Sequence, residues 1–459
     1  MQNIAYAWSA VGGDAARAGR VTVTPRHGAL PARLPVREAA RACVAACALA
    51  AAELAARRAG LARVPGVRVD DGAVATAFTS ERHLLVGGRA PVGFAPLSRF
   101  WRTADGWVRT HANYPHHRQR LLSALRAGEA AGEREVEAAM AERTAADVEE
   151  SVYAAGGLAV AVRTFEEWAR HPQAVALTAR PLVERARLDT ARARVLAPLP
   201  PGGTPLLPAA GLRVLDLSRV IAGPVATRTL SLLGADVLRL DPPGLPELPG
   251  QHADTGFGKR SATLDLATGR RAFEELLAAA DVVVTGYRPG ALDRFGLAAE
   301  ALVERRPGLV VAELSAWGGY GPWGGRRGFD SLVQAATGIA VAEGTARRPG
   351  ALPAQLLDHG SGHLLAAAVL RALTEQSEDG YARVVRVALA RTARWLTEEV
   401  TADTGTAGEE YAGAGPWLTE RDSRLGRLRY ALPPVAFDGG PGDWARPPGP
   451  WGADPARWA

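Results

Sequence analysis

One carboxylate in the sequence stands where a nucleophile could work. Asp358 lies in LLDHGSGHLL, between a pair of leucines and a Gly-Ser-Gly stretch that opens a predicted helix. A helix N-terminus keeps a nearby carboxylate ionised, and small neighbours leave room for an acyl group to approach. An ionised, accessible carboxylate can attack a thioester. The same position also suits a helix N-cap, whose side chain accepts a backbone N–H.

Three loops carry residues suited to an anionic ligand. They read GKRSATLDL from residue 258, GYRPGALDRFG from 286 and YGPWGGRRGFDS from 320. An aromatic ring and several arginines, on loops beside strands of one sheet, can stack on a base and neutralise phosphates. Each arginine alone suits a solvated surface, but the set favours a phosphate-bearing ligand. The candidate side chains are those of Lys259 (the only lysine of the chain), Arg260, Tyr287, Arg288, Arg294, Arg326 and Arg327.

The histidines give no metal motif. His111, His116 and His117 lack the spacing of a helical metal site and have no acidic residue close in sequence, so we predict surface or structural roles for them. His359 and His363 flank Asp358. Either could orient a substrate, and either could be a bystander.

The second half of the chain carries the pattern of a parallel sheet. Four short apolar runs, rich in Val and Leu, are separated by enough chain for crossover connections, and residues 269–280 show helical spacing. This alternation predicts a doubly wound α/β domain over 211–395, whose ligands bind beyond the carboxyl ends of the strands. The predicted strands are 212–218, 235–240, 281–287 and 309–317.

The first half is less regular and predicts an α+β region over 1–195. Residues 37–58 form a helical pattern, and Asp105-Gly106 suggests the turn of a hairpin. Capping boxes are expected at Thr144 with Asp147 and at Thr164 with Glu167. A Pro- and Gly-rich linker over 196–210 separates this region from the α/β domain, and 396–459 is expected to return to that domain.

A partial repeat connects the two halves. Helix 37–58 leads through a Gly-containing turn into an apolar run at 67–69, and segment 361–376 leads through another such turn into a run at 384–390. Both segments are Ala-rich, so coincidence is an alternative to duplication.

Composition bounds the class of protein. The chain has 459 residues, 47% of them hydrophobic, which is enough for two or three cores. The net charge is only +6 and acidic residues are interleaved with the arginines, so a nucleic-acid partner is disfavoured. No signal peptide or membrane span is found, which predicts a cytoplasmic protein without a membrane partner. Cys43 and Cys47 are expected to be small packing residues.

Several blocks of the sequence resemble one known family. Five blocks follow one another, from about residue 211 to about 390, in the order and spacing of the class III CoA-transferases of the CaiB/BaiF type. They are VLDLSRVIAGPVATRTLSLLGADVLRLDPPG, GKRSATLDL, DVVVTGYRPGALDRFGL, RPGLVVAELSAWGGYGPWGGRRGFDSLVQAATGIA and LLDHGSGHLLAAAVLRAL. The resemblance implies that Asp358 is the catalytic aspartate. In that family the carboxylate forms a mixed anhydride with the acyl group and then an aspartyl-CoA thioester. Coenzyme A is a co-substrate, and no cofactor or metal is bound permanently.

The resemblance also implies which residues contact CoA. They are Val220, Lys259, Leu264, Gly286, Tyr287, Arg288, Arg294 and Arg327. The retained lysine suggests a compact ammonium fitted close to a phosphate or a carbonyl.

Departures from the family pattern refine these expectations. Phe329 stands where racemases of the family carry a His, which disfavours proton removal and return. Pro242 replaces a basic residue of the family, which puts one CoA contact in doubt, although Arg239 is close in sequence. The glycine-rich loop of the family's small domain has no obvious counterpart in this chain. That small domain lies in front of the α/β half. This order suggests that a truncated first copy of the family's fold, which retains the small domain, is fused to a second copy, which retains the CoA-binding half. The chain would then be an intrachain pseudo-dimer or form a homodimer.

The function expected from the resemblance is transfer of CoA between an acyl-CoA and a small carboxylic acid. A non-catalytic CoA-binding or scaffold paralogue is the first alternative. An isomerase that moves CoA within one diacid is the second. A nucleic-acid-binding protein is the least favoured, and the sequence does not identify the donor and acceptor acids.

Overall fold

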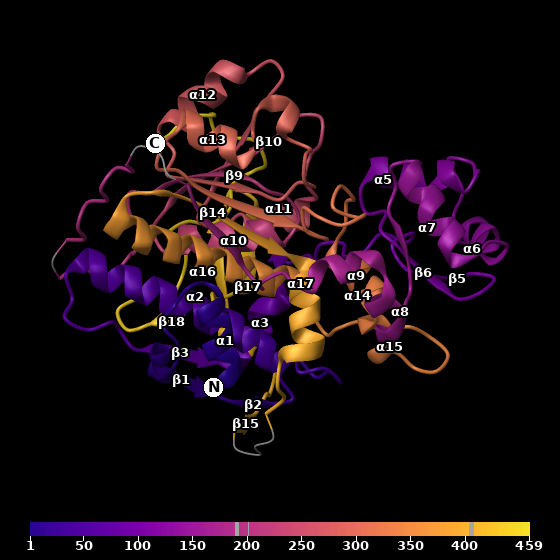
Figure 1. The fold of residues 1–459 in the computed structure, drawn as a ribbon, viewed down its shortest axis with the longest axis horizontal. Helices are drawn as coiled ribbons and strands as arrows, with labels where there is room; N and C mark the ends of the chain where they lie inside the picture. Colours follow the sequence, from indigo (N-terminus) through magenta and orange to yellow (C-terminus); the bar gives the residue numbers. More distant parts are fainter. Residues whose placement is uncertain (189–191, 201, 404–407) are drawn as a thin grey trace.

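A seven-stranded sheet lies at the centre of the computed structural model, which describes residues 1–188, 192–200, 202–403 and 408–459 (Figure 1). The strand order is β11-β10-β9-β12-β13-β14-β8; the strands from β9 to β14 are parallel, and β8 is an antiparallel edge strand. The strands are β8 (Glu184–Leu188), β9 (Arg213–Leu217), β10 (Asp236–Asp241), β11 (Arg260–Thr263), β12 (Val282–Thr285), β13 (Val310–Ser315) and β14 (Ala382–Ala388). The four apolar runs predicted as strands are thereby confirmed.

Helices cover both faces of this sheet because alternate strand residues point to opposite sides. Val214, Val282 and Val310 belong to one apolar core, which includes α10 and α16, whereas Leu215 and Val283 belong to a second core with α12 and α13. In Figure 1, α12 and α13 lie on one side of the sheet and α16 on the other. The helices are α10 (Ala222–Leu232), α12 (Arg270–Ala278), α13 (Ala299–Arg305) and α16 (Leu356–Asp379). The fold is therefore a mixed α/β fold, as the sequence predicted.

Helix α2 (Val36–Ala59) packs against α16 and forms the next layer. Its alanines and two buried cysteines let the helices approach closely, and a Cβ on Gly360 would lie 3.3 Å from Cys43 Sγ. Burial raises the pKa of both thiols, so Cys43 and Cys47 are inert packing residues, as expected. Among the described residues α2 is the one helix long and apolar enough to cross a membrane, but 94% of its apolar window is buried inside the protein.

The two helices share length and context. Each has 24 residues, each ends at a left-handed glycine (Gly60 or Gly380), and each leads into a strand, β3 or β14. Counted from its first residue, Glu38 holds in α2 the position that Asp358 holds in α16. This correspondence extends the partial repeat that the sequence suggests.

A smaller unit with its own core stands to one side of the sheet (Figure 1). Its antiparallel strands β5 (Phe100–Arg102), β6 (Trp107–Thr110) and β7 (Ala159–Ala161) pack with α5 (Pro115–Ala124), α6 (Glu133–Ala141) and α7 (Ala145–Ala154). The turn at Asp105-Gly106 joins β5 to β6 as predicted. Thr144 Oγ1 accepts the N–H of Asp147, and Thr164 with Glu167 forms the capping box of α8. We call residues 94–161 the small domain.

The remaining elements complete the layers around these units. The other helices are α1 (Gln2–Ala10), α3 (Asp71–Phe78), α4 (Ser80–His83), α8 (Phe165–Arg170), α9 (Pro172–Leu177), α11 (Pro249–Thr255), α14 (Asp330–Ala336), α15 (Ile339–Ala342) and α17 (Leu389–Arg394), with short 3-10 or π turns η1 (Ala15–Arg20), η2 (Asp293–Phe295), η3 (Trp395–Glu399) and η4 (Gly415–Trp417). The other strands are β1 (Val21–Thr24), β2 (Arg26–His27), β3 (Val67–Asp70), β4 (Leu85–Val86), β15 (Glu409–Glu410), β16 (Leu418–Ser423), β17 (Gly426–Ala431) and β18 (Ala436–Phe437).

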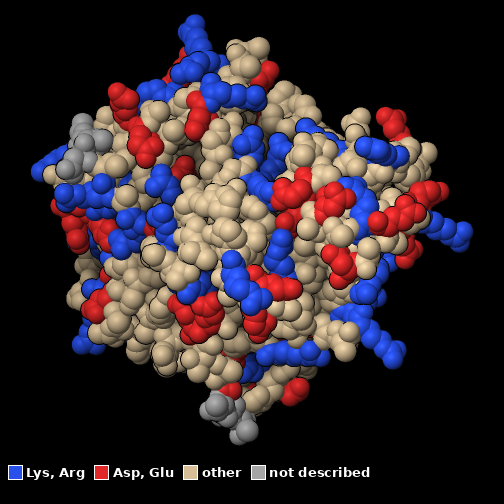
Figure 2. All heavy atoms as spheres, turned by 45° about the vertical axis from the view of Figure 1, so that its right-hand side comes forward, with Lys and Arg blue, Asp and Glu red and all other residues tan. Residues whose placement is uncertain are grey.

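The end of the chain contacts the α/β unit. Trp458 Nε1 donates to the carbonyl of Leu276, and the N–H of Asp454 donates to that of Ser261. The described part of the predicted linker has no helix or strand; residue 201 within it, and 189–191 before it, lie outside the described residues. On the face shown in Figure 2, basic and acidic side chains are intermingled.

Candidate active site

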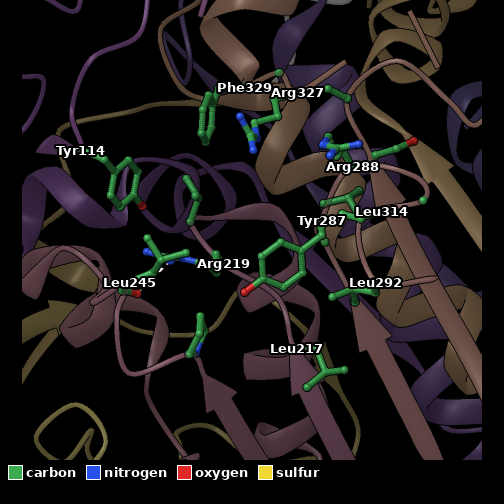
Figure 3. Close-up of a pocket in the computed structure, with 18 of the residues that line it drawn as sticks. Tyr114, Leu217, Arg219, Leu245, Tyr287, Arg288, Leu292, Leu314, Arg327 and Phe329 are labelled. Carbon is green, nitrogen blue, oxygen red and sulfur yellow. Dashed lines mark hydrogen bonds between the residues drawn. The ribbon is translucent and has the colours of Figure 1, made fainter. Parts of the chain in front are cut away.

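A cavity of about 640 Å³ opens between the small domain and the carboxyl ends of the parallel strands (Figure 3). Leu217 ends β9, Leu240 lies near the end of β10, and Gly286 directly follows β12, so the cavity is at the edge of the sheet where open α/β sheets bind ligands. The small domain supplies the opposite wall. Its lining residues are Tyr114, His116, His117 and Arg120.

The structure brings together most of the residues singled out from the sequence. The cavity is lined by the predicted nucleophile and by most of the predicted CoA contacts: Asp358, Val220, Leu264, Gly286, Tyr287, Arg288, Arg294 and Arg327. Lys259 does not line it. Arg326 also lines the cavity, but its guanidinium is paired with Glu150 at 2.7 Å.

Asp358 lies in the first turn of α16 and does not cap it. The helix begins at Leu356, with Gln355 at the cap position, so the N-cap interpretation is wrong. The N–H of Asp358 donates to Asp330 Oδ2 at 3.0 Å, and Asp330 thus satisfies part of the helix start from outside. The Asp358 residue is 6% exposed, lines the cavity, and its carboxylate has no hydrogen-bond partner among the described residues.

The environment of Asp358 opposes its ionisation. Burial raises its pKa well above the usual range, and the carboxylates of Asp330 and Glu81 raise it further. Burial also raises the pKa of Asp330, to about 6. Desolvation and neighbouring negative charge thus raise the pKa of Asp358, opposite to the effect expected from the helix N-terminus. Ester or anhydride formation at this carboxylate removes its unfavourable charge, and such a group is typical of a reactive site.

Four arginines at the cavity have no carboxylate partner among the described residues: Arg120, Arg288, Arg294 and Arg327. The Arg327 guanidinium donates only to the carbonyl of Gly156, at 3.3 Å, and that of Arg294 lies 4.6 Å from the centre of the Phe295 ring. Burial lowers the pKa of Arg327, and the nearby charges of Arg120 and Arg288 lower it further. Figure 3 shows Arg288, Arg327 and the Tyr287 ring bordering one space. Uncompensated positive charge around a cavity favours an anionic ligand such as a phosphate.

Backbone geometry shapes the first loop of the site. Val220 has a φ of +71°, which is rare for a β-branched residue, and its N–H donates to Glu247 Oε2 at 3.1 Å. Gly286 packs directly on the β9 loop, since a Cβ there would lie 3.1 Å from Ser218 Cβ. The two loops are thus in close contact without an intervening side chain.

Lys259 lies beneath the site and does not face it. Its ammonium donates to Asp216 Oδ2 at 3.0 Å, to the carbonyl of Pro224 at 2.9 Å and to Thr227 Oγ1 at 2.5 Å. Burial lowers its pKa to about 8, and Asp216 opposes that shift. The expected contact with a phosphate is therefore wrong for Lys259. Its three donors match three acceptors around one buried point, a geometry that a planar guanidinium does not reproduce.

Lys259→Met is expected to destabilise the fold by about 3–5 kcal/mol, because it leaves the buried Asp216 carboxylate without its cation. Chemical denaturation measures this change. An equally stable variant with weakened CoA binding would contradict the structural role and restore a ligand contact for Lys259.

The small-domain histidines lie closer to the cavity than the sequence predicted. His111 stacks on Phe329 with ring centres 3.9 Å apart, and His116 and His117 line the cavity wall. Burial lowers the pKa of His111 to about 3 and that of His117 to about 2, so both rings are neutral. A surface role is wrong for these two residues because the small domain folds over the sheet edge.

The histidines of α16 point away from the cavity. His359 and His363 pack against the Phe78 ring at 5.3 and 5.6 Å, and neither lines the cavity. His359 Nε2 lies 3.8 Å from the Glu81 carboxylate. Neither residue is therefore placed to orient a substrate in this cavity.

Sequence reasoning missed several residues of the site. Four residues approach the cavity or support its walls only through tertiary contacts: Asp330, Glu247, Tyr114 and Arg219. An acidic residue at the start of a helix was the available signal for Asp330. Arg239 is close in sequence to the position of the family's basic residue, but it is 1% exposed and pairs with Asp241 and Glu247. Pro242, which occupies that position, lines the cavity.

Parts of the chain are similar to known proteins. The model of CoA-transferase family III matches residues 209–431. A probable fatty acyl-CoA transferase of Mycobacterium tuberculosis is 38% identical over 41% of this chain and 52% of its own length. The β subunit of a succinyl-CoA–L-malate CoA-transferase of Chloroflexus aurantiacus is 34% identical over 41% of this chain and 50% of its own.

A solved structure from Mycobacterium tuberculosis shares 39% identity over 42% of this chain and 56% of that one, with a TM-score of 0.40. The chain spans about half the length of the curated relatives it matches. The match to CoA-transferase family III thus covers residues 209–431, just under half of the chain.

Proposed function

We propose that the chain is a CoA-transferase that moves CoA between an acyl-CoA and a small carboxylic acid through Asp358. The observation that carries the proposal is the arrangement of one cavity: an unpartnered carboxylate on its wall and unpaired arginines, Arg288, Arg294 and Arg327, around it. Curated relatives named as CoA-transferases support the reaction class.

The first half-reaction uses the Asp358 carboxylate as nucleophile. One of its oxygens attacks the carbonyl carbon of the bound thioester, and the C–S bond breaks. CoA departs as a thiolate, and an acyl-aspartyl anhydride is formed. The thiolate then attacks the side-chain carbonyl carbon of Asp358 and expels the donor carboxylate. An aspartyl-CoA thioester remains.

The second half-reaction reverses these steps with the acceptor. Its carboxylate attacks the aspartyl-CoA thioester, CoA thiolate leaves, and the thiolate takes the acceptor acyl group from the new anhydride. Asp358 is regenerated as a carboxylate. The reaction needs no redox cofactor or metal, and the arginines hold the CoA phosphates throughout.

The fold offers a matching organisation. We infer a doubly wound, Rossmann-like sheet from the strand order between β11 and β14, with its switch point between β9 and β12; the order supports this assignment. We assign residues 211–395 to the CoA-binding unit, 1–195 to the small domain with a remnant of a large domain, and 396–459 to a segment that returns to the CoA-binding unit. In this organisation the chain is an intrachain pseudo-dimer, in which α2 takes the place of a second copy of α16. A homodimer is the alternative.

Trapping of the intermediate tests the function. The protein is incubated with a panel of acyl-CoAs, quenched with hydroxylamine, digested and analysed by mass spectrometry of the peptide that contains Asp358. A hydroxamate at Asp358 supports the proposal. CoA binding without hydroxamate would instead favour the non-catalytic scaffold, and hydroxamate formation with rearrangement of a single diacyl substrate would favour the isomerase.

Glu81→Gln is expected to move the acidic limb of the kcat/KM profile to lower pH. Asp358 must be deprotonated to attack, and the negative charge of Glu81 raises its pKa, so removal of that charge lowers the pKa. The Glu81 side chain is 33% exposed, and solvent therefore moderates the shift. Initial rates from pH 4 to pH 9 measure it; a shift to higher pH would contradict the assigned electrostatics.

A further inference from the structure

One buried carboxylate connects the two walls of the cavity. Glu247, in the loop after β10, has a fully buried side chain. Its Oε1 accepts the hydroxyl of Tyr114, which precedes α5 in the small domain. Its Oε2 accepts the N–H of Val220 at 3.1 Å and Arg239 Nη2 at 2.9 Å. Both Tyr114 and Val220 line the cavity, one on each wall.

The surroundings keep Glu247 charged. Burial opposes its ionisation, but Arg239 and then Arg219 outweigh burial and lower its pKa to about 2. Arg219 also lies under the Tyr114 ring, with its guanidinium carbon 5.2 Å from the ring centre, and Figure 3 shows these side chains facing each other. Hydrogen bonds to a buried, ionised acceptor are among the stronger ones in proteins.

We propose that Glu247 is a positioning residue that holds the small domain against the CoA-binding unit and fixes the Val220 backbone. The proposal rests on the proposed function, because closure of this wall has a chemical consequence. An acyl-aspartyl anhydride is open to water, which would attack the acyl carbon, release the free acid and restore the Asp358 carboxylate. A closed Tyr114–Glu247 contact excludes that water and commits the intermediate to CoA.

Tyr114→Phe removes the hydroxyl and keeps the ring over Arg219. We expect the ratio of acyl-CoA hydrolysis to CoA transfer to rise roughly tenfold, as loss of one hydrogen bond to a charged acceptor implies. The matched control is Tyr430→Phe, which breaks another tyrosine–carboxylate bond, Tyr430 Oη to Asp443 Oδ2 at 2.7 Å, between residues that do not line the cavity. Tyr430→Phe should lower stability without changing the ratio.

Glu247→Gln gives a second, stronger test. The amide retains one acceptor and no longer neutralises Arg239, so both the ratio and the KM for acyl-CoA should rise further. The combined variant, Tyr114→Phe with Glu247→Gln, should add little to Glu247→Gln alone, since both remove one contact. An unchanged ratio in Tyr114→Phe, or fully additive effects, would overturn the positioning role.

Two readouts separate this inference from the proposed function. Calorimetry with free CoA and amide hydrogen exchange over β6 and α5 need no turnover. If no donor and acceptor pair supports transfer, weaker CoA binding and faster exchange in Tyr114→Phe, but not in Tyr430→Phe, still support the contact as a clamp. Unchanged affinity and exchange would overturn it.

Discussion

Asp358→Asn is expected to reduce CoA transfer by roughly 10³-fold or more, the scale of loss when a nucleophile is removed. Asparagine keeps the size of the side chain but offers no carboxylate to form the anhydride. Steady-state transfer rates and the absence of a hydroxamate at position 358 measure the effect. CoA affinity should change little, because the unpaired arginines and the strand-end loops that line the cavity remain.

The same variant should be more stable than the natural protein at neutral pH. The folded pKa of Asp358 is raised, so its ionisation costs stability as the pH rises from the ordinary carboxyl range toward the folded pKa. Asparagine removes that cost and the repulsion from Asp330 and Glu81. Thermal unfolding should show a higher midpoint near pH 7, with the difference shrinking at acid pH, as reactive sites trade stability for function.

The matched control lies in the partial repeat. Glu38 occupies in α2 the helix position of Asp358, is equally buried at 6% exposure, but pairs with Arg37 at 2.8 Å and lies outside the described cavities. Glu38→Gln should therefore retain transfer and lose stability. Loss of transfer in both variants would contradict a single site at Asp358.

The strands were predictable because burial on both faces requires continuous apolar runs, as in Val282–Thr285. Their order was not, because no local pattern in the sequence records which strands pair. The cavity edge followed from the strand ends, and most CoA-contact candidates lie there. The small domain's contribution, such as Tyr114 and His117, depends on how two units pack, which the residue types alone do not encode.

Electrostatic expectations failed where burial decides them. Lys259 was expected to contact CoA, and Arg239 lies close in sequence to the lost basic position, yet each is enclosed with carboxylates that need a cation. The helix start at Asp358 suggested an ionised group, but Asp330, 28 residues away in sequence, reaches the same helix turn. Spacing along the chain locates a charge, whereas its pKa depends on neighbours that only the fold brings close.

Removal of three of the four unpaired guanidinium groups should weaken CoA binding most. We expect roughly tenfold per arginine, and so about 10³-fold for Arg288→Ala, Arg294→Ala and Arg327→Ala combined, because each supplies a charged contact to a phosphate. The matched control is Arg271→Ala, an exposed arginine on α12 paired with Glu275 at 3.0 Å. It should bind CoA normally.

Calorimetric titrations at two salt concentrations measure this effect. Binding to the natural protein should weaken as salt rises, and the triple variant should be nearly insensitive to salt, because exposed charge contacts are screened. Dephospho-CoA, which lacks the ribose phosphate, should lose less affinity on the triple substitution than CoA does if one arginine serves that group. Equal affinity of the triple variant and the natural protein for CoA would show that the phosphates do not contact these three arginines, and the cavity would then have to bind its ligand through other lining residues, such as Arg120, Tyr287 and the apolar strand ends.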